Sequence, residues 1–281
     1  FSVGLLANLT INLISQSLRI SVVLVAVLGI IGTLLLAFDI FPQIKTFPRP
    51  PLSTLIKNIA LAILVILAYF RVTFQALGTS DMLLIWASQA KMIYEFGGLT
   101  TAINWNELGA WHTDYPKLFQ VTSAQLMYLV GYWSPYTAKM SMFTLIFGGL
   151  IWLFVFYRPS ISFTFLTLLV VFFVPGEILW DGPMDGIFAL WATAAVLCAI
   201  HYASSRELYL LHGTIVTISI CINLKNEGAL LGLCILITIC IGLGALNNRK
   251  QTIKRLIQHK FQILGLSLLS AAPIGLWASY K

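Results

Sequence analysis

Charged side chains are scarce in this chain. Only 10% of the 281 residues are Asp, Glu, Lys or Arg, whereas 59% are hydrophobic. The mean hydropathy of +0.89 lies far above the range of soluble domains. Several windows exceed 18 nearly uncharged apolar residues, the length that a helix needs to cross a bilayer. This composition excludes a soluble globular domain and predicts an all-α, polytopic transmembrane helical bundle.

Cysteine is also sparse, and dense basic surfaces are missing. The four cysteines lie inside apolar runs at irregular spacing, which excludes a disulfide framework and a zinc signature and predicts small core residues. The net charge is +7, but no basic face with interleaved aromatic residues lies outside the apolar runs. Nucleic acid is therefore not an expected partner. The cysteines are Cys198, Cys221, Cys234 and Cys240.

Eight apolar stretches are candidate membrane spans, and residues 1–18 form a weaker ninth. Basic residues in the short loops 42–57 and 247–260 place both loops in the cytoplasm. We divide the chain into an N-terminal transmembrane and linker region, 1–56, and a membrane domain, 57–281. Because Phe1 is not an initiator methionine and Lys281 follows an apolar run directly, we expect a fragment that is incomplete at its C-terminus. The spans are 20–41, 57–77, 137–157, 161–175, 185–203, 207–223, 228–246 and 261–279.

Two further helices are expected at the outer face. Residues 116–132 are marginal for a crossing, and a crossing would export the basic loop 247–260, so this segment is predicted to lie in or dip into the outer interface. Residues 81–97 have the spacing of an amphipathic interfacial helix. Asp81 begins this helix, either as an N-cap that accepts backbone N–H bonds or as a catalytic acid.

Acidic residues are few, and this threading places eight of the ten on the outer side. In a chain with so little charge, one-sided carboxylates indicate chemistry or ion handling at a membrane face. They are Asp81, Glu95, Glu107, Asp114, Glu177, Asp181, Asp185 and Glu227.

The longest polar segment, 97–116, ends in the sequence Trp-His-Thr-Asp-Tyr-Pro. Pro116 favours extended geometry at Tyr115 and fixes a turn at the membrane surface. His112 and Asp114 could serve acid/base chemistry or contact a polar head group. The alternative is a plain turn, with Trp111 and Tyr115 as interfacial anchors.

Two more breaks interrupt the apolar runs. In 175–186, Glu177, Asp181 and Asp185 repel one another unless a cation or substrate compensates. A divalent cation is compatible with these oxygen ligands but not required, since no EF-hand pattern is present. Asp185 could instead cap the following helix. In 223–228, Lys225 and Glu227 either pair with each other or hold a lipid phosphate.

Taken in order, four segments carry a family resemblance. SDMLLIWASQAK, HTDYPKL, DGPMDGIFAL and LKNEG resemble the polytopic GT-C glycosyltransferases, which include the aminoarabinose transferases of lipid A and the dolichyl-phosphate-sugar mannosyl- and glucosyltransferases. The resemblance covers roughly residues 57–246. It implies transfer of a sugar from a polyprenyl-phosphate donor to an acceptor on the non-cytoplasmic side of a membrane, expected to be a bacterial inner membrane.

The resemblance also implies roles for single residues. Asp81 corresponds to the base that deprotonates the acceptor hydroxyl, and Asp114 to the acid of the family's Asp-Tyr-Pro segment. The acid of the second outer loop corresponds to Asp181 or Asp185, and we place Asp185 with Asp81 and Asp114 in the catalytic set. Lys225 corresponds to a ligand of the donor phosphate. Members with the Asp-Tyr-Pro segment often continue with a second proline, where this chain has Lys117, so the donor class stays open. The remaining substrate-binding candidates are His112, Tyr115, Asp181 and Glu227.

Two other functions fit the same composition. A transporter or flippase would use acids that line a passage deep within the spans, whereas these acids gather at the span ends. A non-catalytic subunit that scaffolds a larger membrane complex would need no converging site. An outer pocket where Asp81, Asp114 and Asp185 meet would favour the enzyme.

Overall fold

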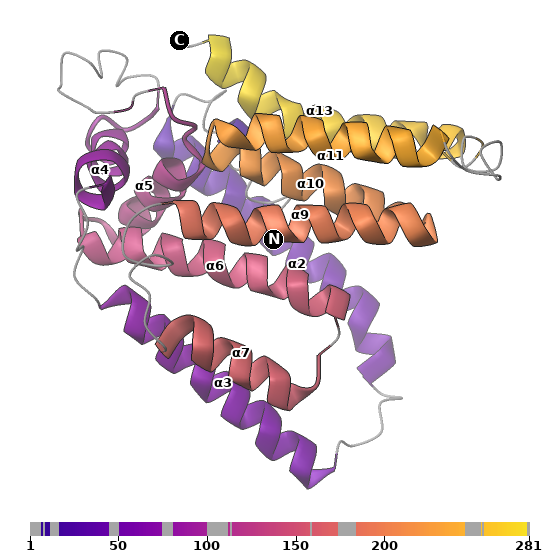
Figure 1. Ribbon diagram of the computed structural model, residues 1–281. Coiled ribbons are helices and arrows are strands. Elements are labelled where there is room, and N and C mark those ends of the chain that lie inside the picture. Colours follow the sequence, from indigo (N-terminus) through magenta and orange to yellow (C-terminus); the bar gives the residue numbers. More distant parts are fainter. Residues whose placement is uncertain are drawn as a thin grey trace.

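All regular structure in the described part of the chain is helical, as the sequence predicts. The computed structural model describes residues 7, 9–11, 17–44, 51–74, 81–99, 112, 114–157, 159–173, 184–244, 254 and 256–279. Figure 1 shows the helices as a bundle. They are α2 (Leu18–Ile44), α3 (Leu52–Thr73), η1 (Met82–Ala87), α4 (Ser88–Glu95), α5 (Leu118–Val130), α6 (Pro135–Tyr157), α7 (Ile161–Phe173), α9 (Asp185–Ser205), α10 (Leu208–Leu224), α11 (Glu227–Gly244) and α13 (Lys260–Ser279).

The bundle has two ends, which are named here by the residues at them. At the Asp185 end, on the left of Figure 1, α9 begins, α10 ends and α11 begins, and α4 and α5 lie at this end. At the Arg206 end, on the right, α9 ends and α10 begins. Successive long helices therefore run in opposite directions, which is the arrangement expected when short loops join antiparallel neighbours.

Three of the described helices are long and apolar enough to cross a membrane: Leu52–Thr73, Pro135–Phe154 and Asp185–Ser205. Other apolar helices account for the remaining predicted spans, so each of the eight stretches contains one helix. The crossing of these other helices stays a prediction; α7 and α10, with 13 and 17 residues, are shorter than the about 20 residues needed to traverse the hydrocarbon core.

The helices differ in how much of their surface the protein covers. Inside the bundle, 61% of the apolar window of α6 is buried, whereas only 17% of that of α3 is. On α3 the buried Leu64, Ala68 and Val72 recur every four residues and form one face, while Ile63 and Phe70 point outward. An apolar helix with most of its surface uncovered is stable when lipid, rather than water, surrounds it.

Polar side chains join distant helices through single hydrogen bonds. Trp191 Nε1 on α9 donates to the Leu145 carbonyl on α6 at 3.1 Å. Ser219 Oγ on α10 donates to the carbonyl of Ser270 on α13 at 2.7 Å. Bonds of this kind between apolar helices satisfy groups that would be costly to leave unpaired in hydrocarbon.

The segment 116–132 folds as the 13-residue helix α5, which ends where Gly131 takes a left-handed conformation at φ 88°. Residues 118–125 are all buried, so α5 packs inside the protein. With 13 residues, α5 is too short to cross a membrane. Its polar residues are covered by neighbouring side chains instead of water. Gln125 Nε2, for example, donates to Ser21 Oγ on α2 at 3.1 Å.

Two local predictions were wrong. Asp81 has helical dihedral angles, and its side chain makes no capping hydrogen bond. The helix that follows starts as a π-helix, η1, before it continues as α4. Among the cysteines, Cys198 and Cys221 are buried as expected. Cys234 and Cys240 both lie on α11 and are exposed, on a part of that helix that the described bundle does not cover.

Candidate functional site

An ion pair joins two of the polar breaks at the Asp185 end. Lys225 follows α10, Asp185 is the first residue of α9, and the Lys225 Nζ donates to Asp185 Oδ1 at 2.5 Å. The Lys225 side chain is 13% exposed and that of Asp185 is 61% exposed, so the lysine is held against the protein while the carboxylate faces outward. Asp185 was a possible cap of α9, but the N-cap residue is Met184, and among the described residues no side-chain capping bond is present. The partner of Asp185 is Lys225 instead.

A hydrogen bond brings the polar segment that contains Asp114 to the same place. Asn226 Nδ2 donates to Asp114 Oδ2 at 3.1 Å, across 112 residues of sequence. Asp114 lies in the turn before α5, and the backbone N–H of Tyr115 closes that turn on the His112 carbonyl at 3.1 Å. Residues from the three breaks that the sequence singled out therefore meet: Asp114, Asp185 and Lys225.

An aromatic stack holds the Asp114 turn against η1. Tyr115 stacks on Trp86 with ring centroids 5.5 Å apart, and His112 stacks on Tyr115 at 5.0 Å. His112 has a φ of 51°, a left-handed conformation that costs a non-glycine residue free energy and persists only where neighbours enforce it. The stack and the closed turn provide that enforcement.

Beneath this turn lies a buried polar cluster. Gln89 Oε1 accepts hydrogen bonds from Lys117 Nζ at 2.8 Å and from Gln120 Nε2 at 3.1 Å. Gln89 Nε2 donates to the His112 carbonyl at 3.3 Å. Because Gln89, Lys117 and Gln120 are almost fully buried, their bonds to one another tie α4, α5 and the turn into one unit.

Gly228 makes the corner that presents Lys225. The Gly228 N–H donates to the Lys225 carbonyl at 3.0 Å, so the chain reverses within a few residues between α10 and α11. A Cβ placed on Gly228 would lie 2.3 Å from the Cys221 carbonyl oxygen and 2.6 Å from the Ile222 backbone nitrogen. Only glycine fits such a backbone approach without moving one helix.

The electrostatics of the site favour a charged lysine. Burial alone would lower the pKa of Lys225, but the hydrogen bond to Asp185, together with the negative charges of Asp185 and Glu227, outweighs it and raises that pKa above its ordinary value. Lys225 and Glu227 form no ion pair within the described part of the chain, because Asp185 is the partner of the lysine.

The other predicted residues are less closely joined. Asp81 is exposed at the start of the segment that carries Trp86, and no hydrogen bond or ion pair within the described residues connects it to Asp114 or Asp185. Asp181 and Glu177 lie outside the described residues. Among the residues that are described, no group of three or more His, Cys, Asp and Glu side chains is arranged to hold a metal ion.

Sequence reasoning missed the parts that support the site. Gln89 and Gln120 interrupt otherwise apolar helical faces, and this was the available signal for a buried polar cluster. Lys117 stood out only as a departure from a family pattern. Asn226 lies between two charged residues and was not predicted as part of the site. Its partner, Asp114, is 112 residues away, and local sequence patterns do not predict a contact over that separation.

Comparison of this chain with protein-family models, with curated proteins and with solved structures found no match. Its function is therefore argued from the site alone.

Proposed function

We propose that this chain is a membrane glycosyltransferase that moves a sugar from a polyprenyl-phosphate donor to an acceptor at the Asp185 end of the bundle. The observation that carries the proposal is the convergence of Asp114, Asp185 and Lys225 from three separate breaks. A surface that only solvates helix ends needs no such convergence. Only 13% of the Lys225 side chain is exposed, so little water solvates its ammonium group. An ionisable group so placed is suited to bind an anionic ligand at the protein face.

Lys225 would bind the donor phosphate. An ammonium carries three N–H donors, and Asp185 takes one of them, which leaves donors for phosphate oxygens. Asp185 is then the positioning residue that holds the ammonium in place. As the bond between the sugar C1 and the phosphate oxygen breaks, the negative charge that develops on that oxygen is stabilised by the fixed ammonium.

A base is needed on the other side of the sugar. The acceptor hydroxyl attacks C1, its proton passes to a carboxylate, and polyprenyl phosphate leaves. Asp81 is exposed and close in sequence to Trp86, whose ring stacks on Tyr115 beside Asp114. We assign Asp81 as this base, with Asp114 as a ligand for sugar hydroxyls. His112 and Tyr115 would offer an aromatic surface to the sugar ring.

The position of the acids favours this function over transport. Asp114, Asp185 and Glu227 lie in turns or at the first residue of a helix, at one end of the bundle. A carrier that moves a charged substrate across the bilayer would place ionisable groups along the path between the two ends.

A transfer assay tests the proposal. The purified chain in liposomes is given radiolabelled polyprenyl-phosphate mannose, glucose or aminoarabinose with a membrane-extract acceptor, and release of polyprenyl phosphate is followed. We expect turnover with one of these donors and a loss of about 100-fold or more in Asp81→Asn, the range for removal of a general base. Glu95→Gln, which removes an exposed acid of the neighbouring helix, should keep full turnover. No release with any donor would reject the proposal.

A further inference from the structure

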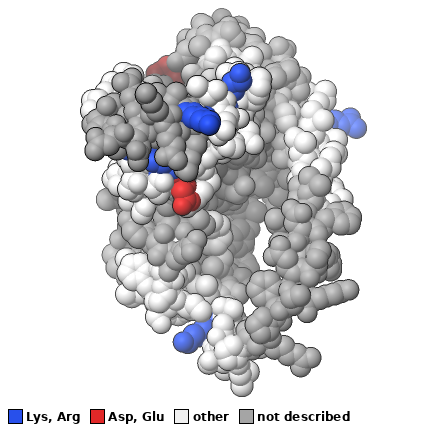
Figure 2. Space-filling model, turned by 90° about the vertical axis from the view of Figure 1, so that its right-hand side faces the viewer, with Lys and Arg blue, Asp and Glu red and all other residues white. Residues whose placement is uncertain are grey.

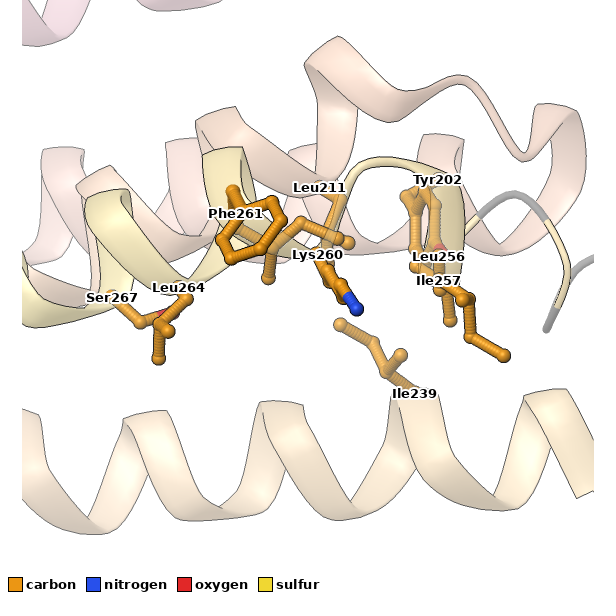
Figure 3. Close-up of a pocket in the computed structure, with 10 residues that line it drawn as sticks. Tyr202, Leu211, Ile239, Leu256, Ile257, Lys260, Phe261, Leu264 and Ser267 are labelled. Carbon is orange, nitrogen blue, oxygen red and sulfur yellow. The ribbon is translucent and has the colours of Figure 1, made fainter.

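A cavity of about 720 Å³ lies at the Arg206 end, far from the candidate site. α9 has 21 residues, so at about 1.5 Å per residue its two ends are roughly 30 Å apart. Figure 3 shows that the cavity lies between α11 and the start of α13, with Ile239 on one side and Phe261 and Leu264 on the other. Its volume is in the range of a small-molecule site.

The walls of this cavity are almost entirely apolar, with one cation among them. Figure 3 shows the amine of Lys260 directed into the gap toward Ile239. Lys260 is exposed, and its Nζ lies 5.1 Å from the centroid of the Phe261 ring. An apolar slot with a cation at its border matches a molecule that has hydrocarbon chains and an anionic head.

A second, more polar hollow of about 440 Å³ adjoins the first and shares Tyr202 and Leu256 with it. Arg206 and His259 line it, together with one acid, Glu207. Arg206 and Glu207 form no ion pair within the described part of the chain. Figure 2 views the molecule from this end and shows basic side chains, together with acidic ones, on the described part of its surface.

Arg206 carries a donor that no described residue uses. Its buried Nη1 atom has no hydrogen-bond partner among the described residues, and the same holds there for His212 Nε2 on the adjoining α10. A buried donor without an acceptor costs free energy that a ligand oxygen would recover. Arg206 also has a φ of 60°, a left-handed conformation at the end of α9 where glycine is the usual residue. The guanidinium lies over the Tyr202 ring, with Cζ 5.9 Å from the ring centroid, and a cation suits the C-terminal end of a helix. These interactions do not use the Nη1 donor, which can bind an oxygen of a ligand.

We propose that the Arg206 end is a binding site for an acidic phospholipid of the adjacent leaflet, with acyl chain in the slot between α11 and α13 and phosphate at Arg206 and Lys260. We infer the occupant from the apolar slot together with the two cations, Arg206 and Lys260, that lie beside it. A soluble phosphate would leave the apolar slot empty, and a lipid without a phosphate would leave the buried guanidinium donor unsatisfied. A zwitterionic phospholipid offers the same phosphate, but its ammonium group would be repelled by Arg206 and Lys260. This site is independent of the sugar-transfer site, because it involves the opposite ends of α9, α10 and α11.

Native mass spectrometry of the full chain in detergent provides the test. Dioleoylphosphatidylglycerol and dioleoylphosphatidylcholine have the same acyl chains and differ in charge, so their ratio of retention reports the headgroup alone. We expect the wild type to prefer phosphatidylglycerol. Removal of one cation should reduce this preference roughly fivefold, the contribution of a single basic residue near anionic lipid.

Arg206→Gly is the decisive variant because glycine suits the left-handed backbone, and its melting temperature should be unchanged or higher. Lys260→Gln should lower the preference by a similar factor. Lys91→Gln, on α4 at the other end, should leave it unaltered. The proposal is overturned if the wild type retains both lipids equally, if Arg206→Gly keeps the preference, or if glycerol 3-phosphate binds as tightly as phosphatidylglycerol.

Discussion

Asp185 and Lys225 are forty residues apart in the sequence and joined by a 2.5 Å hydrogen bond at one end of the bundle. The bond fixes the start of α9 against the corner between α10 and α11. It also orients the Lys225 ammonium near the negative charges of Asp185 and Glu227.

The pKa of Lys225 depends on this contact. In the folded protein Asp185 raises it, whereas burial alone would lower it. Asp185→Asn should therefore lower the pKa of Lys225, because the variant lacks the negative charge that offsets the effect of burial. Titration of ¹³C-dimethylated lysine by NMR measures the change. Glu95→Gln removes the exposed partner of Lys91, 3.5 Å away, and should leave the Lys225 resonance unchanged.

The sign of the pH dependence follows from the same shift. Since the folded pKa of Lys225 lies above its ordinary value of 10.5, the stabilisation from the ion pair is fully present below that pH. It is lost as the pH rises through the folded pKa. Asp185 is 61% exposed, so solvent screens the pair and the contribution is small. A wild-type protein whose melting temperature rises between pH 10 and 11 relative to Asp185→Asn would contradict this assignment.

Gly228 should tolerate no side chain. Gly228→Ala places a methyl group against the backbone of Cys221 and Ile222, and the strain should cost about 1–3 kcal/mol. Gly265→Ala is the matched control, because a Cβ at Gly265 meets nothing within 4 Å. Melting temperatures in detergent should fall for Gly228→Ala and stay level or rise for Gly265→Ala. Equal effects would show that the corner is not tightly packed.

Gln89 should act as the support of the Asp114 turn. Gln89→Ala removes its bonds to Lys117, Gln120 and the His112 carbonyl, and each buried group left without this partner costs about 1–3 kcal/mol. The melting temperature should fall, and the fluorescence of Trp86 should change as Tyr115 moves. Gln262→Ala, which removes an exposed glutamine bonded to His259, serves as the control and should have little effect.

The outward face of α3 should contact lipid. Ile63 is 52% exposed and Ala68 is 0% exposed on the same helix. In a cysteine-free background, a spin label at Ile63→Cys in bilayers should show high accessibility to oxygen and low accessibility to a water-soluble nickel chelate. A label at Ala68→Cys should be shielded from both. Preferential contact of the Ile63 label with the nickel chelate would place this face in water and reject the membrane assignment for α3.

The sequence was sufficient for the helices because hydrophobicity is a local property. Each predicted span contains a helix, and the reversal of direction between successive long helices follows from loop lengths. The failures are local as well. Asp81 looked like a cap by residue type, but capping depends on a single backbone conformation that the side chain alone does not determine.

The site was predictable only in outline. Polar residues at the ends of apolar runs had to lie at one of two membrane faces, so the approach of Asp114, Asp185 and Lys225 was open to reasoning from charge and threading. The individual hydrogen bonds and ion pairs among them could not be predicted in this way. Glu227 is two residues from Lys225 in the sequence and was an equally good candidate for its partner. The corner at Gly228 instead turns the lysine toward Asp185 on α9.

Binding of undecaprenyl phosphate to Lys225 tests the central claim most directly. The wild type, Lys225→Gln and Lys91→Gln are titrated with this lipid in detergent, and the bound fraction is followed by ³¹P NMR. We predict saturable binding to the wild type and to Lys91→Gln, with an affinity about tenfold or more lower in Lys225→Gln because a charge-assisted hydrogen bond is lost. Equal binding by Lys225→Gln and the wild type would show that this cluster does not hold a lipid phosphate.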